Sequence, residues 1–325
     1  MHPDTENGRW ILRPAVELWP AAGRRSLLVG HEIVTVRAAG VDVDALLRAL
    51  TDEGVDQGAV EAGAFGEADT VERLLETMLR SGLVGPRWEP SGEPSDRQVP
   101  YYSLFGVDPV AAHGRISRAR VAIVGVGGIG GPVAVDLVAA GIGRLVLVDF
   151  DVVEVHNLNR QHTYNRADLG TAKVDALRAR LLRIRPETSI DTVTCRIGTP
   201  DDIDVDGGLD VVVCAADSPP SIGAICTEIA IRHRAAVSFA GIGLGRGFVG
   251  PITPYGETVA PPTNADSGPT AFSFGPANQV IASILSGELL RYLATQATPL
   301  ATSRLIVDTL SWSTAVKNMP LGASR

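Results

Sequence analysis

A polar run at residues 157–161, with the sequence NLNRQ, carries the side chains best suited to chemistry. Arg160 offers a planar, permanently charged fork of donors, and the amides of Asn157 and Gln161 add neutral donors and acceptors. Lys173 follows 12 residues after Gln161 and supplies a second cation. Such donors neutralise the charge that develops when a phosphoanhydride bond breaks. The pattern therefore indicates a site that grips and cleaves a triphosphate.

A glycine-rich turn, GVGGIGG, precedes this run and follows an apolar segment. Backbone N–H groups of such a turn approach phosphate oxygens closely, and the following helix favours an anion at its N-terminus. Asp149 lies 24 residues after Gly125, where a carboxylate at a strand end accepts hydrogen bonds from ribose hydroxyls. A nicotinamide dinucleotide site has these same two features. The glycines predicted to line the nucleotide are Gly125, Gly127, Gly128 and Gly130.

Two further carboxylates complete the predicted site. Asp217 follows an apolar strand-like segment, at the sheet edge where an acidic side chain would hold Mg²⁺ on the phosphates. Asp151 is a candidate nucleotide ligand, with a simple strand-end cap as the alternative. A nicotinamide site requires neither the polar run nor Lys173. The pattern therefore favours ATP with Mg²⁺ over a dinucleotide.

From Val121 onward, short apolar segments alternate with stretches of helical periodicity. This alternation is typical of an α/β fold with a doubly wound, Rossmann-like, mostly parallel sheet. Further strands at 246–252 and 304–310 flank a helix at 277–294. The alternating strands are predicted at 121–126, 144–150, 189–195, 209–216 and 236–242, and the helices between them at 129–140, 171–184 and 220–233.

The first 85 residues are predicted to form a small α+β domain of winged-helix type. Two β-rich segments around Gly30 and His31 indicate a hairpin. Two amphipathic helices follow, one capped by Asp42 and one with Asp69 and Glu72 at the spacing of a capping box. Residues 86–100 combine Pro, Ser, Gly and charge without periodicity, as an interdomain linker does. Residues 101–325 form the second predicted domain.

Composition excludes several classes of protein. The chain is 45% hydrophobic and 20% charged, which suits a soluble protein with a full core, and its formal charge of −8 argues against a nucleic-acid partner. No uncharged apolar run reaches the roughly 18 residues of a membrane span, and no secretory signal is visible, so we expect a cytoplasmic protein. Cys195, Cys214 and Cys226 contain no CxxC pair, which predicts buried thiols and no zinc site.

The segment from about Arg120 to Lys317, some 60% of the chain, resembles the adenylating enzymes that activate thiamine and molybdopterin sulfur carriers and ubiquitin. The glycine turn, DFD at 149–151, NLNRQ and the downstream Lys173 carry the resemblance. It implies that Gly127 and Gly128 line ATP and that Asp149 binds its ribose. Lys173 and the polar run would contact phosphates, and Asp217 would hold Mg²⁺. The resemblance also implies a homodimer.

Three departures from that family bear on the substrate. The zinc-binding CxxC pairs of the sulfur-carrier branch are missing, and the segment Pro254–Gly275 has no cysteine for a thioester. Relatives often supply an arginine to the partner subunit from a position where this chain has YYSLFG, and only Arg115 or Arg118 lies close enough in sequence to substitute. A sulfur carrier is therefore the less favoured substrate.

The N-terminal domain resembles the leader-peptide recognition element of enzymes that modify ribosomally made peptides. Such an element adds the leader as a strand beside its hairpin and packs it against the last helix, here Val71–Arg80. The alternative is a dimerisation or lid domain without peptide specificity. The predicted peptide-binding residues are Glu32, Ile33, Val34, Thr35, Val36 and Arg37.

Together these patterns predict an ATP-dependent adenylyltransferase. The resemblance to leader-binding and microcin-maturing enzymes implies that it activates a carboxylate of a precursor peptide during natural-product maturation. Two alternatives remain: an adenylyltransferase for a sulfur-carrier protein, and a non-catalytic scaffold that binds a leader peptide for a partner cyclodehydratase. Retention of Arg160, Lys173 and Asp217 counts against the scaffold.

Overall fold

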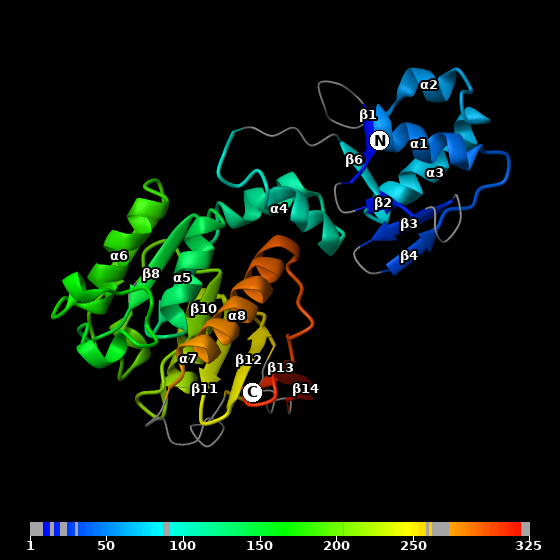
Figure 1. The fold of residues 1–325 in the computed structure, drawn as a ribbon. Coiled ribbons are helices and arrows are strands. Elements are labelled where there is room, and N and C mark those ends of the chain that lie inside the picture. Colours follow the sequence, from blue (N-terminus) through cyan, green and yellow to red (C-terminus); the bar gives the residue numbers. More distant parts are fainter. Residues whose placement is uncertain are drawn as a thin grey trace. The chain divides into compact units, whose positions relative to one another are not determined.

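The protein divides into two compact units in a computed structural model, Met1–Gly114 and Arg115–Arg325 (Figure 1). The predicted linker over 86–100 lies in the first unit, and its residues 87–91 lie outside the described part of the chain. The short helix η2 (Val99–Phe105) and helix α4 (Pro109–Ile116) follow it. The structure describes residues 9–13, 16–19, 25–29, 32–86, 92–203, 205–257, 260–261 and 273–319.

The second unit is built on an eight-stranded sheet in the order β14-β13-β12-β11-β10-β7-β8-β9. Strands β7 to β11 pair in parallel, whereas β12, β13 and β14 continue the sheet in antiparallel fashion. The predicted doubly wound, mostly parallel sheet is confirmed. The strands are β7 (Arg120–Val124), β8 (Arg144–Val148), β9 (Ser189–Val193), β10 (Val211–Cys214), β11 (Ala236–Ile242), β12 (Arg246–Thr253), β13 (Ser303–Asp308) and β14 (Ser313–Asn318).

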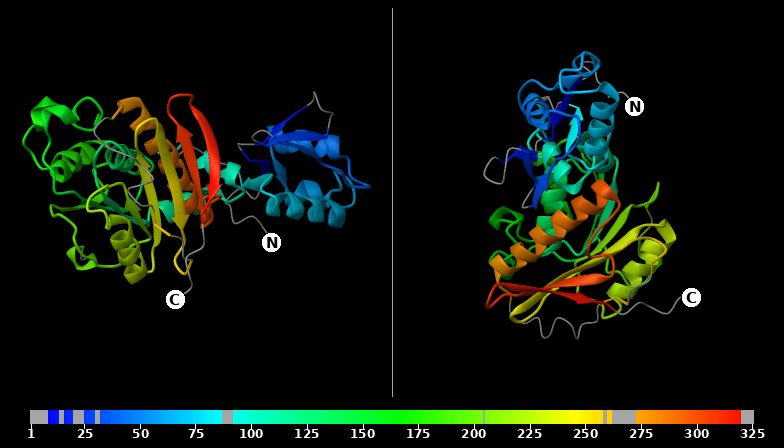
Figure 2. Two further views of the ribbon diagram at one scale, coloured as in Figure 1. Left: turned by 90° about the horizontal axis from the view of Figure 1, so that it is seen from below. Right: turned by 90° about the vertical axis from the view of Figure 1, so that its right-hand side faces the viewer.

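Helices cover both faces of this sheet. Helix α7 (Ile222–His233) packs on β10 and β11, while α8 (Gly275–Thr295) packs on α5 and lies across β11 and β12 (Figure 2). Helices α5 (Gly130–Ala139) and α6 (Lys173–Ile184) pack on each other. Because both faces are covered, β7 and β8 read as continuous apolar runs rather than alternating ones.

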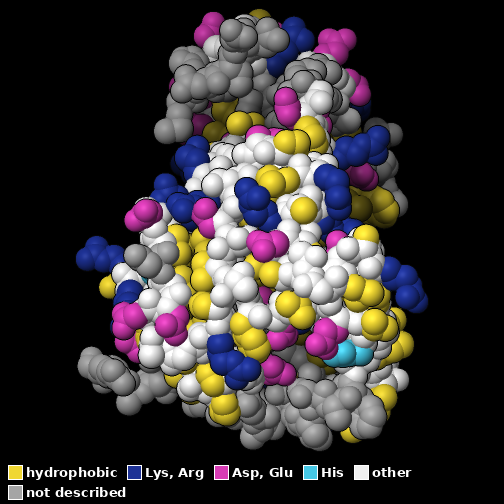
Figure 3. Space-filling view, turned by 90° about the vertical axis from the view of Figure 1, so that its left-hand side faces the viewer, with side chains coloured by type: hydrophobic (Ala, Val, Ile, Leu, Met, Phe, Trp, Pro, Cys, Tyr) yellow, Lys and Arg dark blue, Asp and Glu magenta, His cyan; other side chains and the backbone are white. Residues whose placement is uncertain are grey.

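The surface around α6 carries charges of both signs. Four arginines lie between residues 178 and 185. Arg178 donates to the Ile190 carbonyl, and Arg185 pairs with Glu187. Lys, Arg, Asp and Glu side chains are interspersed on the face shown in Figure 3. Arg178 and Arg183 are exposed, whereas Arg180 and Arg185 are half-buried. None of the helices among the described residues combines the length and apolar character that crossing a bilayer requires.

Among its described residues, the first unit holds two three-stranded sheets, the helices α1 to α3, η2 and most of α4. The predicted hairpin is confirmed by antiparallel pairing of β3 with β4, and its turn at residues 30–31 lies outside the described residues. Strands β1, β2, β5 and β6, each of two to four residues, lie outside the predicted elements. The elements are β1 (Arg9–Leu12), β2 (Val16–Leu18), β3 (Ser26–Val29), β4 (Glu32–Thr35), α1 (Val43–Asp52), β5 (Val55–Asp56), α2 (Gln57–Glu61), α3 (Ala68–Arg80) and β6 (Val84–Pro86).

One predicted helix cap is confirmed and one is wrong. The Asp42 carboxylate accepts the Ala45 N–H at 3.0 Å and begins α1 as expected. Helix α3 begins earlier than its predicted capping box, because its N-cap is Glu67 and Asp69 is already inside the helix. The Glu72 carboxylate instead accepts a 2.6 Å hydrogen bond from the Gln57 side chain of the adjacent α2. Glu72 therefore makes a tertiary contact with α2 instead of the capping contact that the local pattern predicts.

Gly130 sets the distance between the start of α5 and the glycine turn. A Cβ at this position would lie 1.9 Å from the Gly125 carbonyl oxygen. We therefore expect Gly130→Ala to lower the free energy of unfolding by about 1–3 kcal/mol in urea titrations, since overpacking forces the backbone apart. Gly287→Ala is the matched control, because a Cβ there meets no atom within 4 Å, and it should stabilise α8 by about 0.5–1 kcal/mol. Equal stability of the two variants would contradict this role.

Candidate active site

A cavity of about 360 Å³ opens at the carboxyl ends of the parallel strands. Ligand sites of doubly wound sheets lie at this edge, at the point where the strand order reverses. Gly130 does not line the cavity, since it packs behind the turn. The other predicted site residues do line it: Gly125, Gly127, Gly128, Asp149, Asp151, Asn157, Arg160, Gln161, Lys173 and Asp217.

The glycine turn forms the floor of the cavity. Gly125 has a φ of 86°, and a Cβ there would lie 2.9 Å from the Ala215 backbone, so the turn and the end of β10 approach each other closely. At Gly128 an added Cβ would lie 3.1 Å from the amide of Asn278. The turn therefore presents bare backbone to the cavity, which is the surface that a phosphate group requires.

Asp149 ties the end of β8 to the glycine turn. Its two carboxylate oxygens accept the N–H groups of Val126 and Asp151, each at 2.9 Å. A carboxylate has about four acceptor positions, so both oxygens keep capacity for a ribose hydroxyl. The side chain is thus positioned by protein donors and remains on the cavity wall.

Lys173 is held at the cavity because residues 172–173 pair with residues 151–152. Val152 and Ala172 form a β-bridge, and the Lys173 N–H donates to the Asp151 carbonyl at 2.9 Å. The ammonium donates to the Asp151 carboxylate at 2.7 Å, with the lysine side chain 6% exposed and the carboxylate side chain 46% exposed. A buried ammonium requires such a partner. Because Lys173 has three donors, it keeps two for a phosphate.

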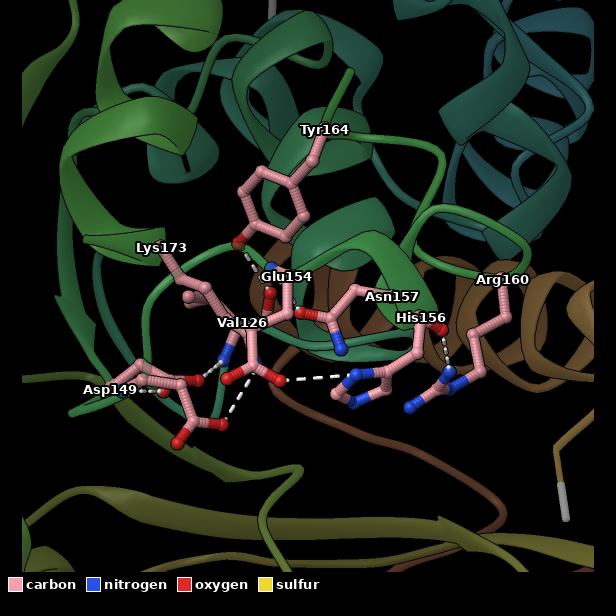
Figure 4. Close-up of polar contacts among 9 residues, drawn as sticks. Val126, Asp149, Glu154, His156, Asn157, Arg160, Tyr164 and Lys173 are labelled. Carbon is pink, nitrogen blue, oxygen red and sulfur yellow. Dashed lines mark hydrogen bonds and ion pairs between the residues drawn. The ribbon is translucent and has the colours of Figure 1, made fainter. Parts of the chain in front are cut away.

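The polar run begins at the last residue of a short 3₁₀ helix, η3 (Val155–Asn157), and continues as a loop (Figure 4). Asn157 is buried and its side-chain oxygen accepts the Glu154 N–H at 3.0 Å. The Arg160 guanidinium donates through Nη1 to the His156 carbonyl at 2.6 Å and to Asn159 Oδ1 at 3.0 Å, and the residue lines the cavity. Gln161 is 5% exposed, and its buried Oε1 forms no hydrogen bond within the described residues. A ligand donor in the cavity would satisfy this oxygen.

Asp217 lies in the exposed segment after β10, on the cavity rim. No group of three or more His, Cys, Asp or Glu side chains with metal-binding geometry occurs within the ranges that the structure describes. A single carboxylate at the rim fits a Mg²⁺ ion that takes most of its ligands from phosphates and water.

Several cavity residues were missed by the sequence reasoning. Asn278, at the start of α8, lies 117 residues after Gln161 and faces the same turn. Phe239 and Phe248 contribute the apolar wall from β11 and β12. Cys195 also lines the cavity and is only partly buried, contrary to the buried thiol predicted for it. Burial, followed by the charge of Asp202, raises the pKa of Cys195, so the thiol form persists at neutral pH.

The residues present fit a nucleoside triphosphate. Bare glycine backbone, two cations, a carboxylate at the end of β8 and an unpartnered amide oxygen meet in one cavity beside an apolar wall. A nicotinamide dinucleotide would account for the turn and Asp149 but not for Arg160 and Lys173 at the same place.

Comparison with known proteins supports the predicted family. The model of the ThiF family matches residues 96–325. The chain is 36% identical over 151 residues to SAMP-activating enzyme E1 of Haloferax volcanii, covering 45% of this chain and 56% of that protein. It is 31% identical over 223 residues to the sulfur carrier protein adenylyltransferase of Thermus thermophilus, covering 61% of this chain and 78% of that protein. The first of these matches spans about half the relative's length.

The fold is also that of a solved microcin-related enzyme. E. coli MccB in complex with MccA superimposes with a TM-score of 0.78 at 21% identity, covering 97% of this chain and 98% of that chain. MccB in complex with ATP superimposes equally well, with a TM-score of 0.78 and 97% of this chain covered. The similarity spans both compact units, and the fold class predicted from the sequence is confirmed. With its family model matched over residues 96–325, the chain belongs to the ThiF family.

Proposed function

We propose that this protein is an ATP- and Mg²⁺-dependent adenylyltransferase that activates a carboxylate of a ribosomally made precursor peptide. The cavity carries the proposal, because it collects Arg160, Lys173 and Asp217 around a glycine turn and Asp149, the candidate ribose ligand. The peptide carboxylate attacks the α-phosphorus, pyrophosphate leaves, and an acyl adenylate results. Catalysis consists of positioning and charge stabilisation without a covalent bond to the enzyme.

Each residue has a defined task in this reaction. The turn at Gly127 and Gly128 binds phosphate oxygens through its N–H groups, and Arg160 with Lys173 stabilises the charge that accumulates on the departing pyrophosphate. Asp217 would hold Mg²⁺, which would lower the charge on the phosphates further. Asp151, now paired with Lys173, orients the ammonium toward the cavity.

The first unit supports a peptide substrate. Strand β4 is at the edge of its sheet, in the order β2-β3-β4, and Ile33 on it is 53% exposed. An edge strand with an exposed apolar side chain suits addition of an extended peptide. Strand β4 covers Glu32–Thr35 of the predicted peptide-binding residues, Val36 is buried, and Arg37 is exposed. The structural similarity to MccB in complex with MccA includes this unit.

A sulfur-carrier protein is the second candidate substrate, favoured by the names of the relatives above. Pyrophosphate exchange distinguishes the two candidates. Radiolabelled pyrophosphate is exchanged into ATP in the presence of short peptides encoded beside the gene, or of a small carrier protein ending in Gly-Gly. We expect exchange with a peptide alone. Exchange with the carrier alone supports the second candidate, and binding of the peptide without any exchange supports a non-catalytic scaffold.

We also propose that the protein is a homodimer, since soluble oligomers are most often twofold and the family resemblance implies one. Multi-angle light scattering should therefore give a mass near twice the 34.1 kDa of the chain. A single species at the mass of one chain at micromolar concentration would remove the dimer from the proposal.

A further inference from the structure

The peptide groups on either side of Val126 in the glycine turn are held by hydrogen bonds from two different segments (Figure 4). The Val126 N–H donates to Asp149 at 2.9 Å. Its carbonyl accepts the hydroxyl of Tyr164 at 2.7 Å. Val126 itself is fully buried, and within the described part of the chain no other group is hydrogen-bonded to this carbonyl. Tyr164 therefore determines where the carbonyl points.

The direction of this carbonyl also sets the direction of the next N–H group. A peptide unit is planar and trans, so the C=O of Val126 and the N–H of Gly127 point to opposite sides. With the carbonyl directed at Tyr164, the Gly127 N–H is turned away from that ring. Gly127 lines the cavity and Val126 does not. The N–H thus lies on the side where a phosphate oxygen would bind.

The turn cannot hold this orientation by itself. Rotation of the peptide unit between Val126 and Gly127 changes ψ of the valine and φ of the glycine. Glycine adopts positive and negative φ at little cost, so the chain can adopt the flipped orientation without a steric clash at Gly127. In the flipped state a carbonyl oxygen would face the phosphate in place of an N–H donor. An external hydrogen bond is therefore needed to favour the donor orientation.

Tyr164 belongs to the same loop as the phosphate-site residues. Its N–H donates to the Gln161 carbonyl at 3.0 Å, which fixes the two residues in one turn. The Gln161 amide lies 3.5 Å from the position of a Cβ on Gly127. The loop thus contacts the glycine turn at two points, through Gln161 on the cavity side and through Tyr164 behind it. Burial, with the negative charge of Asp149 next, raises the pKa of Tyr164 far above its usual value.

We propose that Tyr164 is a positioning residue for ATP, whose hydroxyl holds the Val126 carbonyl so that the Gly127 N–H stays available to a phosphate. The inference rests on the proposed use of ATP in this cavity. Tyr164 does not line the cavity, so it acts through the turn and makes no contact with the nucleotide. Its hydroxyl remains a donor over the whole physiological pH range.

The test removes only the hydroxyl, by Tyr164→Phe, and measures ATP binding by isothermal titration calorimetry together with KM for ATP and kcat. We expect Kd and KM to rise about tenfold, as for loss of one well-formed hydrogen bond, with a smaller change in kcat. Tyr292→Phe is the matched control, because Tyr292 is also buried in this unit but does not line the cavity. Its affinity for ATP should equal that of the wild type.

A second variant tests whether a hydrogen-bond donor at this place is what the turn requires. Replacing Tyr164 with 4-aminophenylalanine retains a donor at the same place and should restore most of the ATP affinity. The inference is overturned if Tyr164→Phe binds ATP as tightly as the wild type. It is also overturned if affinity falls and the amino analogue does not restore it, since donation to the Val126 carbonyl would then not be the property that ATP binding requires. Failure of the wild type itself to bind ATP would instead refute the proposed function, and this inference with it.

Discussion

Replacing Lys173 with alanine is expected to lower kcat of pyrophosphate exchange by about 100-fold or more while the protein stays folded. The ammonium lies at the cavity with its side chain 6% exposed, so water cannot replace the charge it brings to the departing pyrophosphate. The fold should tolerate the change, because the partner carboxylate of Asp151 is 46% exposed and water can solvate it when the lysine is gone.

Lys317→Ala is the control for this experiment, because Lys317 is the only other lysine of the chain and lies exposed on β14. Its kcat should match the wild type. Thermal unfolding of both variants, without nucleotide, checks that the fold is retained. A Lys173→Ala protein that exchanges pyrophosphate at near-normal rates would show that other groups stabilise the departing pyrophosphate. The role assigned to Lys173 would then be withdrawn.

A proline at one position of β4 is expected to weaken binding of the leader peptide by about tenfold or more without changing ATP affinity. An added strand is held by main-chain hydrogen bonds, and proline has no N–H to donate. Strand β4 pairs with β3 through Leu27 opposite Val34 and Leu28 opposite Ile33. N–H groups of successive residues in a strand point to opposite edges, so only one of each neighbouring pair faces outward.

The experiment therefore uses Ile33→Pro and Val34→Pro side by side in the full chain. One of the two breaks the ladder to β3 and should lower the melting temperature, whereas the other removes an outward N–H and should not. The variant with the unchanged melting temperature is then titrated with a labelled leader peptide and, separately, with ATP. Wild-type affinity for the leader in that variant would contradict strand addition at β4 and favour the dimerisation or lid role for this unit.

The elements that carry the site follow from local sequence. The apolar runs of β7 and β8, the glycine turn and the polar run NLNRQ each predict their own conformation, because a buried parallel strand, a turn with bare backbone and a cluster of donors are local properties. Their order along the chain also predicts a doubly wound sheet, in which the carboxyl ends of these strands meet. The sequence therefore predicts a nucleotide cavity at the carboxyl ends of these strands without any knowledge of tertiary contacts.

Contacts between distant segments depended on the tertiary structure. Periodicity describes one segment at a time, so it does not reveal that Asn278 faces Gly128, that Asp151 pairs with Lys173, or that Tyr164 bonds to Val126. The same limit explains why Glu72 pairs with Gln57 rather than capping α3. The types of the residues determined which groups the site contains. Packing of α8 and of the 157–164 loop against the glycine turn decided how those groups point, because hydrogen-bond direction depends on a partner that lies far away in the sequence.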